Sequence, residues 1–182
     1  MPQKSLKDLT GKWKMSKSAS SDPAPVLELQ GVNAFIRKAA SSAPVSLDIT
    51  QKGTEEYFIK QSTTASIPGI SEEWYPSRPE KWVEGSDQLL GKSRSRSKWG
   101  RVGELEGIDA WLLEGLDGGE EMVVAEVESS DGNGWRAVQV WFVDGEGRFV
   151  RRVITTGGKG AQGKGEGEEK RVESLLIYEF EG

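Results

Sequence analysis

The chain has 182 residues, 35% of them hydrophobic, and a net charge of −5 with both signs interspersed. This length suits one domain with a real core, residues 1–182, and the acidic balance argues against nucleic acid as a partner. The sequence contains no cysteine and no histidine, which excludes disulfides, thiolate chemistry, Ser-His triads and the usual zinc ligands.

The chain also lacks the signals of a membrane or secreted protein. The first residues, MPQKSLKDLTGKW, contain no apolar signal region, and no apolar run approaches the ~20 residues that span a bilayer. We therefore expect a cytoplasmic protein without stable membrane insertion, and nothing in the sequence calls for a metal or another cofactor.

The first elements are a strand and a helical segment. Residues 10–15, TGKWKM, alternate polar and large apolar side chains, which is typical of a half-buried strand. Apolar residues between 27 and 40 then recur at spacings of two to four, which predicts two short helical turns over about residues 26–41. Gly31 interrupts them, and Pro44 ends the segment.

From residue 45 onward the pattern predicts strand after strand. Apolar residues alternate over 45–49, 57–65 and 70–74, and the prolines of 76–90 indicate a longer loop that carries Trp82 and Val83. Further strands are predicted at 92–102, 111–113, 122–128, 135–143, 148–155 and 171–180. Residues 157–170 are rich in glycine and charge, which predicts a flexible loop and not a phosphate-binding one, because the GxxxxGK[ST] spacing is missing.

These elements predict an all-β fold of about ten short antiparallel strands, with a helix-turn-helix lid after the first. A sheet of that size removes its exposed edges by closing into a barrel. The first and last strands would then be neighbours.

Three segments carry a resemblance to a known family. GKWKM at 11–15, LQGVNAFIRKAA at 29–40 and EYFIKQSTT at 56–64 resemble, in order and spacing, the intracellular fatty-acid-binding and retinoid-binding proteins of the calycin superfamily. The likeness covers the first third of the chain, and LLIYEF at 175–180 resembles the family's last strand. This chain is longer than a typical member, with the extra length around residues 76–120 and in the glycine-rich loop.

The resemblance implies a barrel with a cavity for a long apolar ligand. It places Trp13 at the closed end, and it implies two sets of ligand-binding residues: Val32, Ile36 and Ala40 at the portal, and Gln61, Thr63 and Ala65 facing the lumen. Alternation along a strand puts i, i+2 and i+4 on one side, which agrees with the second set. Polar Gln61 and Thr63 suit a ligand cavity better than a filled core.

The residues with which the family binds carboxylates are only partly present in this chain. Its Arg-x-Tyr pair on the last strand keeps Tyr178 but has Leu176 at the arginine position, and the position of a second arginine falls near Gln139 or Val140. A buried carboxylate needs a paired cation. The ligand is therefore neutral or differently anchored, or an arginine comes from Arg94, Arg96 or Arg152.

Two further groups of residues leave alternatives open. Trp99, Trp111, Trp135 and Trp141 either fill the core or line a flat pocket for a polycyclic ligand. Arg94, Arg96 and Lys98 alternate with Ser93, Ser95 and Ser97, so the inner face of this strand is either Arg-lined or Ser-lined. Glu126 and Glu128 either share that lumen, giving an acid/base pair with Arg96, or form an exposed ladder of charges.

The leading hypothesis is intracellular binding of a hydrophobic small molecule, such as a lipid, terpenoid or polyketide, in the lumen. The alternative is a cavity enzyme, an isomerase or cyclase, in which Arg96 or Tyr178 polarises a carbonyl and Glu126 moves a proton. A filled barrel that serves as an interaction module is a third hypothesis.

Overall fold

The computed structural model describes residues 4–63, 71–78, 80–158 and 169–182. The predicted glycine-rich loop therefore lies largely outside the described residues. The strands are β1 (Gly11–Met15), β2 (Val45–Lys52), β3 (Glu56–Thr63), β4 (Ser71–Pro76), β5 (Val83–Asp87), β6 (Gly91–Arg101), β7 (Glu121–Ser129), β8 (Trp135–Val143), β9 (Phe149–Gly157) and β10 (Arg171–Phe180). The helices are α1 (Ala24–Leu29), α2 (Ala34–Ser42) and the 3₁₀ turn η1 (Ala110–Leu113).

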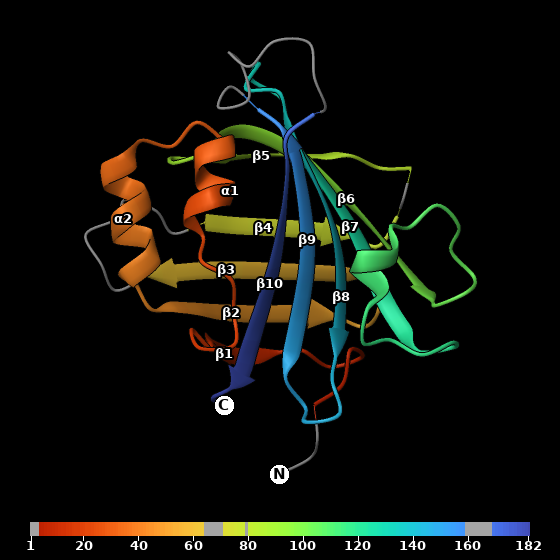
Figure 1. Cartoon of the computed structure of the whole chain (residues 1–182). Helices are drawn as coiled ribbons and strands as arrows, with labels where there is room; N and C mark the ends of the chain where they lie inside the picture. The colour runs from red at the N-terminus through yellow and green to blue at the C-terminus, as the bar shows by residue number, and fades with distance from the viewer. Residues whose placement is uncertain (1–3, 64–70, 79, 159–168) are drawn as a thin grey trace.

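The ten strands form one antiparallel sheet in the order β4-β3-β2-β1-β10-β9-β8-β7-β6-β5. The first and last strands are neighbours, since Trp13 pairs with Phe180 and Met15 with Tyr178. Figure 1 shows β2, β3 and β4 running across the back of the molecule behind β8, β9 and β10, with α1 and α2 at one end. The predicted ten-stranded antiparallel barrel with two short helices after the first strand is confirmed, and the barrel is nearly closed.

The edge strand β4 is joined to β6 by side-chain hydrogen bonds, and no backbone ladder pairs these two strands among the described residues. Ser95 Oγ donates to the carbonyl oxygen of Trp74 at 3.0 Å, and Ser97 Oγ donates to that of Pro76 at 3.0 Å. Ser77 Oγ accepts a hydrogen bond from the backbone N–H of Trp99 at 3.1 Å. Serines on the inner face of β6 therefore close the seam against β4.

The lid follows from local capping chemistry. Pro25 lies in the first turn of α1, where its missing N–H costs nothing, and Gly31 takes a left-handed φ of 85° between the helices. Asn33 caps α2 by accepting a hydrogen bond from the N–H of Ile36 at 3.0 Å. Leu29 anchors the lid, because it is buried in a cluster with Trp135 and Val153.

Two expectations about irregular segments were wrong. The predicted loop over 76–90 contains strand β5, and the apolar residues at 111–113 form η1 instead of a strand. Figure 1 shows η1 outside the barrel wall. There Leu112 packs with Val140, Val150 and Ile154, so this segment covers the outer face of β7 to β10.

No helix in the described parts of the chain is long and apolar enough to cross a membrane.

The inner core lies at the end of the barrel away from the lid. It is rich in aromatic rings, with Trp13 packed against Phe149 and Phe180, and Trp141 packed edge-on against Tyr57 and Tyr75. This packing leaves the lid end open for a cavity.

Candidate functional site

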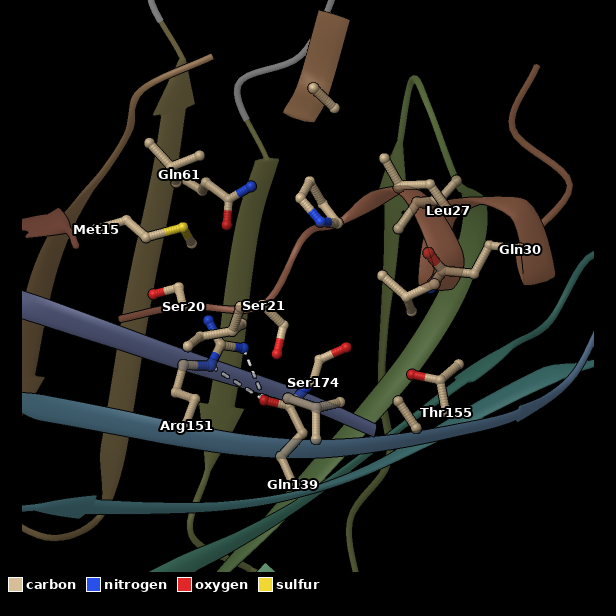
Figure 2. Close-up of a pocket in the computed structure, with 18 of the residues that line it drawn as sticks. Met15, Ser20, Ser21, Leu27, Gln30, Gln61, Gln139, Arg151, Thr155 and Ser174 are labelled. Atoms are coloured by element: carbon tan, nitrogen blue, oxygen red, sulfur yellow. Dashed lines mark hydrogen bonds between the residues drawn. The ribbon is translucent and has the colours of Figure 1, made fainter. Parts of the chain in front are cut away.

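A cavity of about 530 Å³ lies between the aromatic core and the lid. Its floor is formed by the inner faces of β8, β9 and β10, and α1 contributes Leu27 and Gln30 to its roof (Figure 2). The remaining apolar lining includes Val45, Leu90, Val127, Trp135, Ala137, Val153 and Leu176. A mainly apolar concave site of this size suits a small organic ligand.

A buried arginine lies on the cavity floor. Arg151 has 3% of its surface exposed, and its guanidinium lies over the ring of Trp141, 5.2 Å from the ring centroid. Its Nε and Nη2 donate to Gln139 Oε1 at 3.1 and 2.8 Å, and Nη2 also donates to Glu73 Oε2 at 3.0 Å. These contacts hold the guanidinium in one orientation.

The acceptors of this network are themselves held in place. Gln139 Oε1 also accepts from the indole N–H of Trp141 at 2.9 Å, and Glu73 Oε2 accepts from the hydroxyl of Tyr75 at 3.0 Å. Because the acceptors have other donors, the arginine position is set by three strands, β4, β8 and β9. Such a rigid polar group in an apolar cavity is preorganised for a ligand.

Part of the guanidinium remains available. Within the described part of the chain, Arg151 makes its hydrogen bonds through Nε and Nη2, and Nη1 makes none. Figure 2 shows the side chain bonded to Gln139 on one side, with the other terminal nitrogen directed into the cavity. The hydroxyl of Tyr178 is also buried, with no partner of good hydrogen-bond geometry among the described residues, although Arg151 lies near enough to lower its pKa as a hydrogen-bond donor does. Nη1 and this hydroxyl are donors for a ligand oxygen.

The protonation states follow from burial and from the ion pair. Burial by itself would lower the pKa of Arg151, but the attraction of Glu73, Tyr178 and Tyr75 and the hydrogen bond to Glu73 together outweigh it, and the pKa of Arg151 is raised. Burial raises the pKa of Tyr178 to about 12, although the nearby Arg151 cation opposes that rise. Burial and the charge of Glu73 also raise the pKa of Tyr75 well above its usual value. At neutral pH the buried floor of the site therefore holds the Arg151 cation, paired with Glu73, and neutral phenols, whereas Lys17, Asp22 and Asp87 are the other charged residues of the lining.

The structure brings only part of the predicted binding set to this cavity. Six residues of that set line it: Ala40, Gln61, Thr63, Gln139, Leu176 and Tyr178. Figure 2 shows the amide of Gln61 directed into the space above Arg151. Six others do not line the cavity: Val32, Ile36, Arg94, Arg96, Trp111 and Trp141. Ala65 lies outside the described residues.

The predicted acid/base group is not assembled in the lumen. Glu126 is hydrogen-bonded to Arg96 and, at 2.6 Å, to Arg136. This cluster lies on the outer face, because the alternate residues Ala125 and Val127 of β7 face the core. Tyr178 lies on the inner side of the barrel wall, so Arg96 and Glu126 meet each other on the outer face but do not meet Tyr178.

The outer position of Arg94 and Arg96 has a clear cause. Both guanidiniums lie over the ring of Trp82, and Arg94 Nε donates to Glu128 Oε1 at 2.6 Å. Ser95 and Ser97, which alternate with them, are used at the seam with β4. The inner face of β6 is therefore lined by serine.

Sequence reasoning missed Arg151 and Glu73. It considered Arg152, the next residue on β9, as a substitute for the arginine missing at position 176. In the structure Arg151 is the direct cross-strand partner of Leu176. The arginine thus lies one strand away from the position expected for the family. The signal that could have found it is the alternation from Phe149, which places 151, 153 and 155 on one face.

Comparison of the sequence with known proteins identifies two fungal relatives. The chain is 27% identical over 165 residues to "Pericyclase pydY" of Acremonium sp, covering 84% of this chain and 86% of that protein. It is 29% identical over 136 residues to "Probable pericyclase scpY" of Mollisia scopiformis, covering 69% of each. No protein-family model matches the chain.

Comparison of the structure identifies lipid-binding barrels. A "REP1-NXSQ fatty acid transporter" matches with a TM-score of 0.61 at 16% identity, covering 96% of this chain and 97% of that one. Lipid binding protein 8 of Caenorhabditis elegans matches with a TM-score of 0.61 at 14% identity, covering 97% of both. A Schistosoma mansoni fatty acid binding protein in complex with arachidonic acid matches with a TM-score of 0.56 at 13% identity, covering 95% and 96%. The chain thus has the fatty-acid-binding-protein fold.

Proposed function

We propose that this chain is a pericyclase, which folds a flexible, mostly apolar carbonyl compound in the barrel lumen and promotes its ring closure. The observation that carries the proposal is the buried guanidinium of Arg151, held by Gln139 and Glu73 in an apolar cavity with Nη1 unbonded. The two fungal relatives, both named as pericyclases, support the same class of reaction.

The chemistry suits the residues that line the cavity. In a cycloaddition, two new σ bonds form as π bonds of the same molecule are used up, so no atom enters or leaves and no side chain must move a proton. A chain without histidine or cysteine can therefore perform it. The protein's contribution is to hold the reacting ends together and to exclude water.

Arg151 has a specific electronic role in this proposal. Its Nη1 donates a hydrogen bond to a carbonyl conjugated to the reacting alkene, which withdraws electron density from that alkene. Because the negative charge on the carbonyl oxygen grows in the transition state, a donor that is already in place stabilises the transition state more than the ground state. Removal of one such donor costs about 10²-fold in rate.

The charge balance of the site favours a neutral ligand over a fatty acid. Glu73 already pairs with Arg151 at 3.0 Å, so a bound carboxylate would bring a second negative charge to one buried cation. Taking an incompletely paired carboxylate out of water is costly. A ketone, amide or similar carbonyl accepts a hydrogen bond from Nη1 without that cost.

The test is the rate of ring closure of synthetic linear ketones, each with a conjugated diene and an activated alkene, over a series of linker lengths. The purified chain should accelerate closure for at least one linker length and favour one stereoisomer relative to buffer. Arg151→Met should lose about 10²-fold of the acceleration, whereas Arg152→Met, on the outer face, should keep it.

A carrier function is the second candidate, supported by the fold and by the apolar lining. In that case the ketones bind, but the rate and stereochemistry of closure equal those in buffer for every linker length. That result would contradict the pericyclase proposal.

A further inference from the structure

Thr63 Oγ1 on β3 lines the cavity without a hydrogen-bond partner among the described residues. Three further buried polar atoms of this kind lie on the β8–β10 floor, apart from the arginine network: Thr155 Oγ1, Ser174 Oγ and Trp135 Nε1. The three residues are 1%, 5% and 3% exposed, and all line the same cavity as Arg151. Figure 2 shows the hydroxyl groups of Thr155 and Ser174 on the cavity side of the β9–β10 floor. Unpaired buried polar groups destabilise a fold, so their presence needs a cause.

The strand register explains why these groups do not satisfy one another. Thr155 pairs with Ala137 on β8 and with Val172 on β10. Trp135 and Ser174 are each two residues from those partners, so both are diagonal neighbours of Thr155 on the inner face. Diagonal positions are roughly 7–8 Å apart, too far for hydroxyl groups on short side chains to bond directly. An atom of another molecule can lie between Thr155 and either of these neighbours.

The three groups lie at increasing distances from the arginine along the floor, Ser174 first, then Thr155 and Trp135. Thr155 follows Arg151 by four residues on β9, about 13 Å along the strand at roughly 3.3 Å per residue. Ser174 pairs with Val153, halfway between them. Val153 lies between Arg151 and Thr155 on the inner face of β9, and Leu176 lies beside Arg151 on β10. Along β9 itself, an apolar side chain therefore separates the guanidinium from the hydroxyl of Thr155.

We infer that Thr155, Ser174 and Trp135 form a second binding subsite, which takes an uncharged hydrogen-bonding group of the substrate. We call it the hydroxyl subsite. None of its members carries a charge, and together they offer an N–H donor and two hydroxyls that donate or accept. A carbonyl, an amide or a hydroxyl fits this set.

The substrate class follows from the two polar ends. The ligand is a linear compound with one carbonyl at Arg151 and a second uncharged polar group at the far end of an apolar segment. This step rests on the proposed function, because it places the first carbonyl at Arg151. Attachment at two points sets the end-to-end length of the chain and so folds its middle part, where the ring closes.

The experiment compares two ligands of equal chain length by calorimetry: a linear monoketone, and the same ketone with a primary amide at the far end. Wild-type protein should bind the keto-amide about tenfold more tightly, the equivalent of one good hydrogen bond. The Thr155→Val/Ser174→Ala double variant, which removes both hydroxyls and little volume, should lose that preference and keep its affinity for the monoketone. The matched control is Thr156→Val, on the outer face of β9, which should behave as wild type.

Thermal unfolding of the ligand-free variants separates a binding role from a structural one. Because the hydroxyls have no partner, their removal should leave the melting temperature unchanged or higher. A lower melting temperature, equal wild-type affinities for the two ligands, or a preference that survives in the double variant would each overturn the subsite.

The outcome is independent of the pericyclase test. Preference for the keto-amide without any acceleration of ring closure would leave the subsite standing and overturn the proposed reaction. Acceleration without that preference would overturn the subsite alone.

Discussion

Two adjacent arginines of β9 have similar immediate neighbours and opposite surroundings. Arg151 lies over Trp141, with Glu73 at 3.0 Å, and Arg152 lies over Trp111, with Glu114 at 3.3 Å. The first faces the cavity, and the second lies on the outer face, where η1 largely covers it. A tryptophan ring and a carboxylate therefore do not decide what an arginine does.

What differs is how well each face of the strand is filled. On the outer face, η1 and the loop around it pack against the apolar side chains of β7 to β10, and Arg152 bonds to the carbonyl oxygen of Trp111 at 3.2 Å. On the inner face, the aromatic core stops at Trp141, and the space beyond Arg151 stays open as the cavity. The same strand is thus a structural wall on one side and a binding surface on the other.

The largest expected effect comes from exchanging the two arginines in turn for methionine. Arg151→Met leaves the Glu73 carboxylate without its cation, and should lower the free energy of unfolding by about 3 kcal/mol, near the lower end for breaking a buried pair. Arg152→Met, whose partner Glu114 is largely exposed, should change it by less than about 1 kcal/mol. Urea unfolding measures both.

A second change sharpens this comparison. Adding Glu73→Gln to Arg151→Met removes the unpaired carboxylate and should recover part of the lost stability, but not the affinity for a ketone. If Arg151→Met and Arg152→Met lowered the free energy of unfolding by the same amount, the inner and outer ion pairs would not differ in their contribution to stability.

A large-to-small mutation under η1, on the outer face, should lower stability without affecting ligand binding. Leu112→Ala removes a side chain that is 1% exposed between η1 and the sheet, and should lower the free energy of unfolding by about 3 kcal/mol. Ketone affinity at a temperature where the variant is folded should stay within twofold of wild type. Leu116→Ala, at a partly exposed position of the same cluster, is the control and should cost less. A large loss of affinity in Leu112→Ala would show that the two faces are coupled.

The seam between β4 and β6 should show a smaller effect. Ser97→Ala removes the buried hydrogen bond to the carbonyl oxygen of Pro76 and should cost about 1 kcal/mol. Amide hydrogen exchange in β4 should become faster. Ser93→Ala is the control, because the side chain of Ser93 makes no hydrogen bond among the described residues. Unchanged amide exchange in both variants would mean that other contacts hold β4 against β6.

The smallest effect is the pH dependence of the outer ion-pair cluster. Burial would raise the pKa of Glu126, but hydrogen bonds from Arg96 and Arg136 outweigh it and lower that pKa below the ordinary 4.5. A lowered folded-state pKa stabilises the fold above the unfolded pKa, and this contribution is lost as pH falls through the folded value. The stability difference between wild type and Glu126→Gln should therefore be constant near neutral pH and shrink below about 4.5. A difference that persists at low pH would contradict the assignment.

Parts of the fold could be predicted because the local signals are strong there. The helix pair with Gly31 between its halves, and the alternation of 45–49 and 57–63, gave the lid and the first strands. The strand β5 was missed because VEGSD carries no apolar alternation, having a neighbouring strand on one side only. The turn η1 was taken for a strand because three apolar residues, WLL, fit either structure.

Arg151 was missed for a related reason. Alternation reveals the inner face of a strand only where the other face meets water. On β9 both faces are buried, with Val150 and Ile154 under η1 and Phe149 and Val153 inside. In the run FVRRVI, alternation places Arg151 on the face of Phe149 and Arg152 on the other, but hydrophobicity does not tell which of the two faces is the inner one.

The sequence by itself determined the class of molecule: an all-β barrel with a lid, without histidine or cysteine, and without the arginine that the family has at position 176. These properties follow from periodicity, turn residues and composition, which are local. Only the tertiary structure decided that Arg151 replaces that arginine from the neighbouring strand, and that Thr155, Ser174 and Trp135 lie in one cavity with it. Strand register and the covering of the outer face set both, and each depends on contacts between residues far apart in the chain.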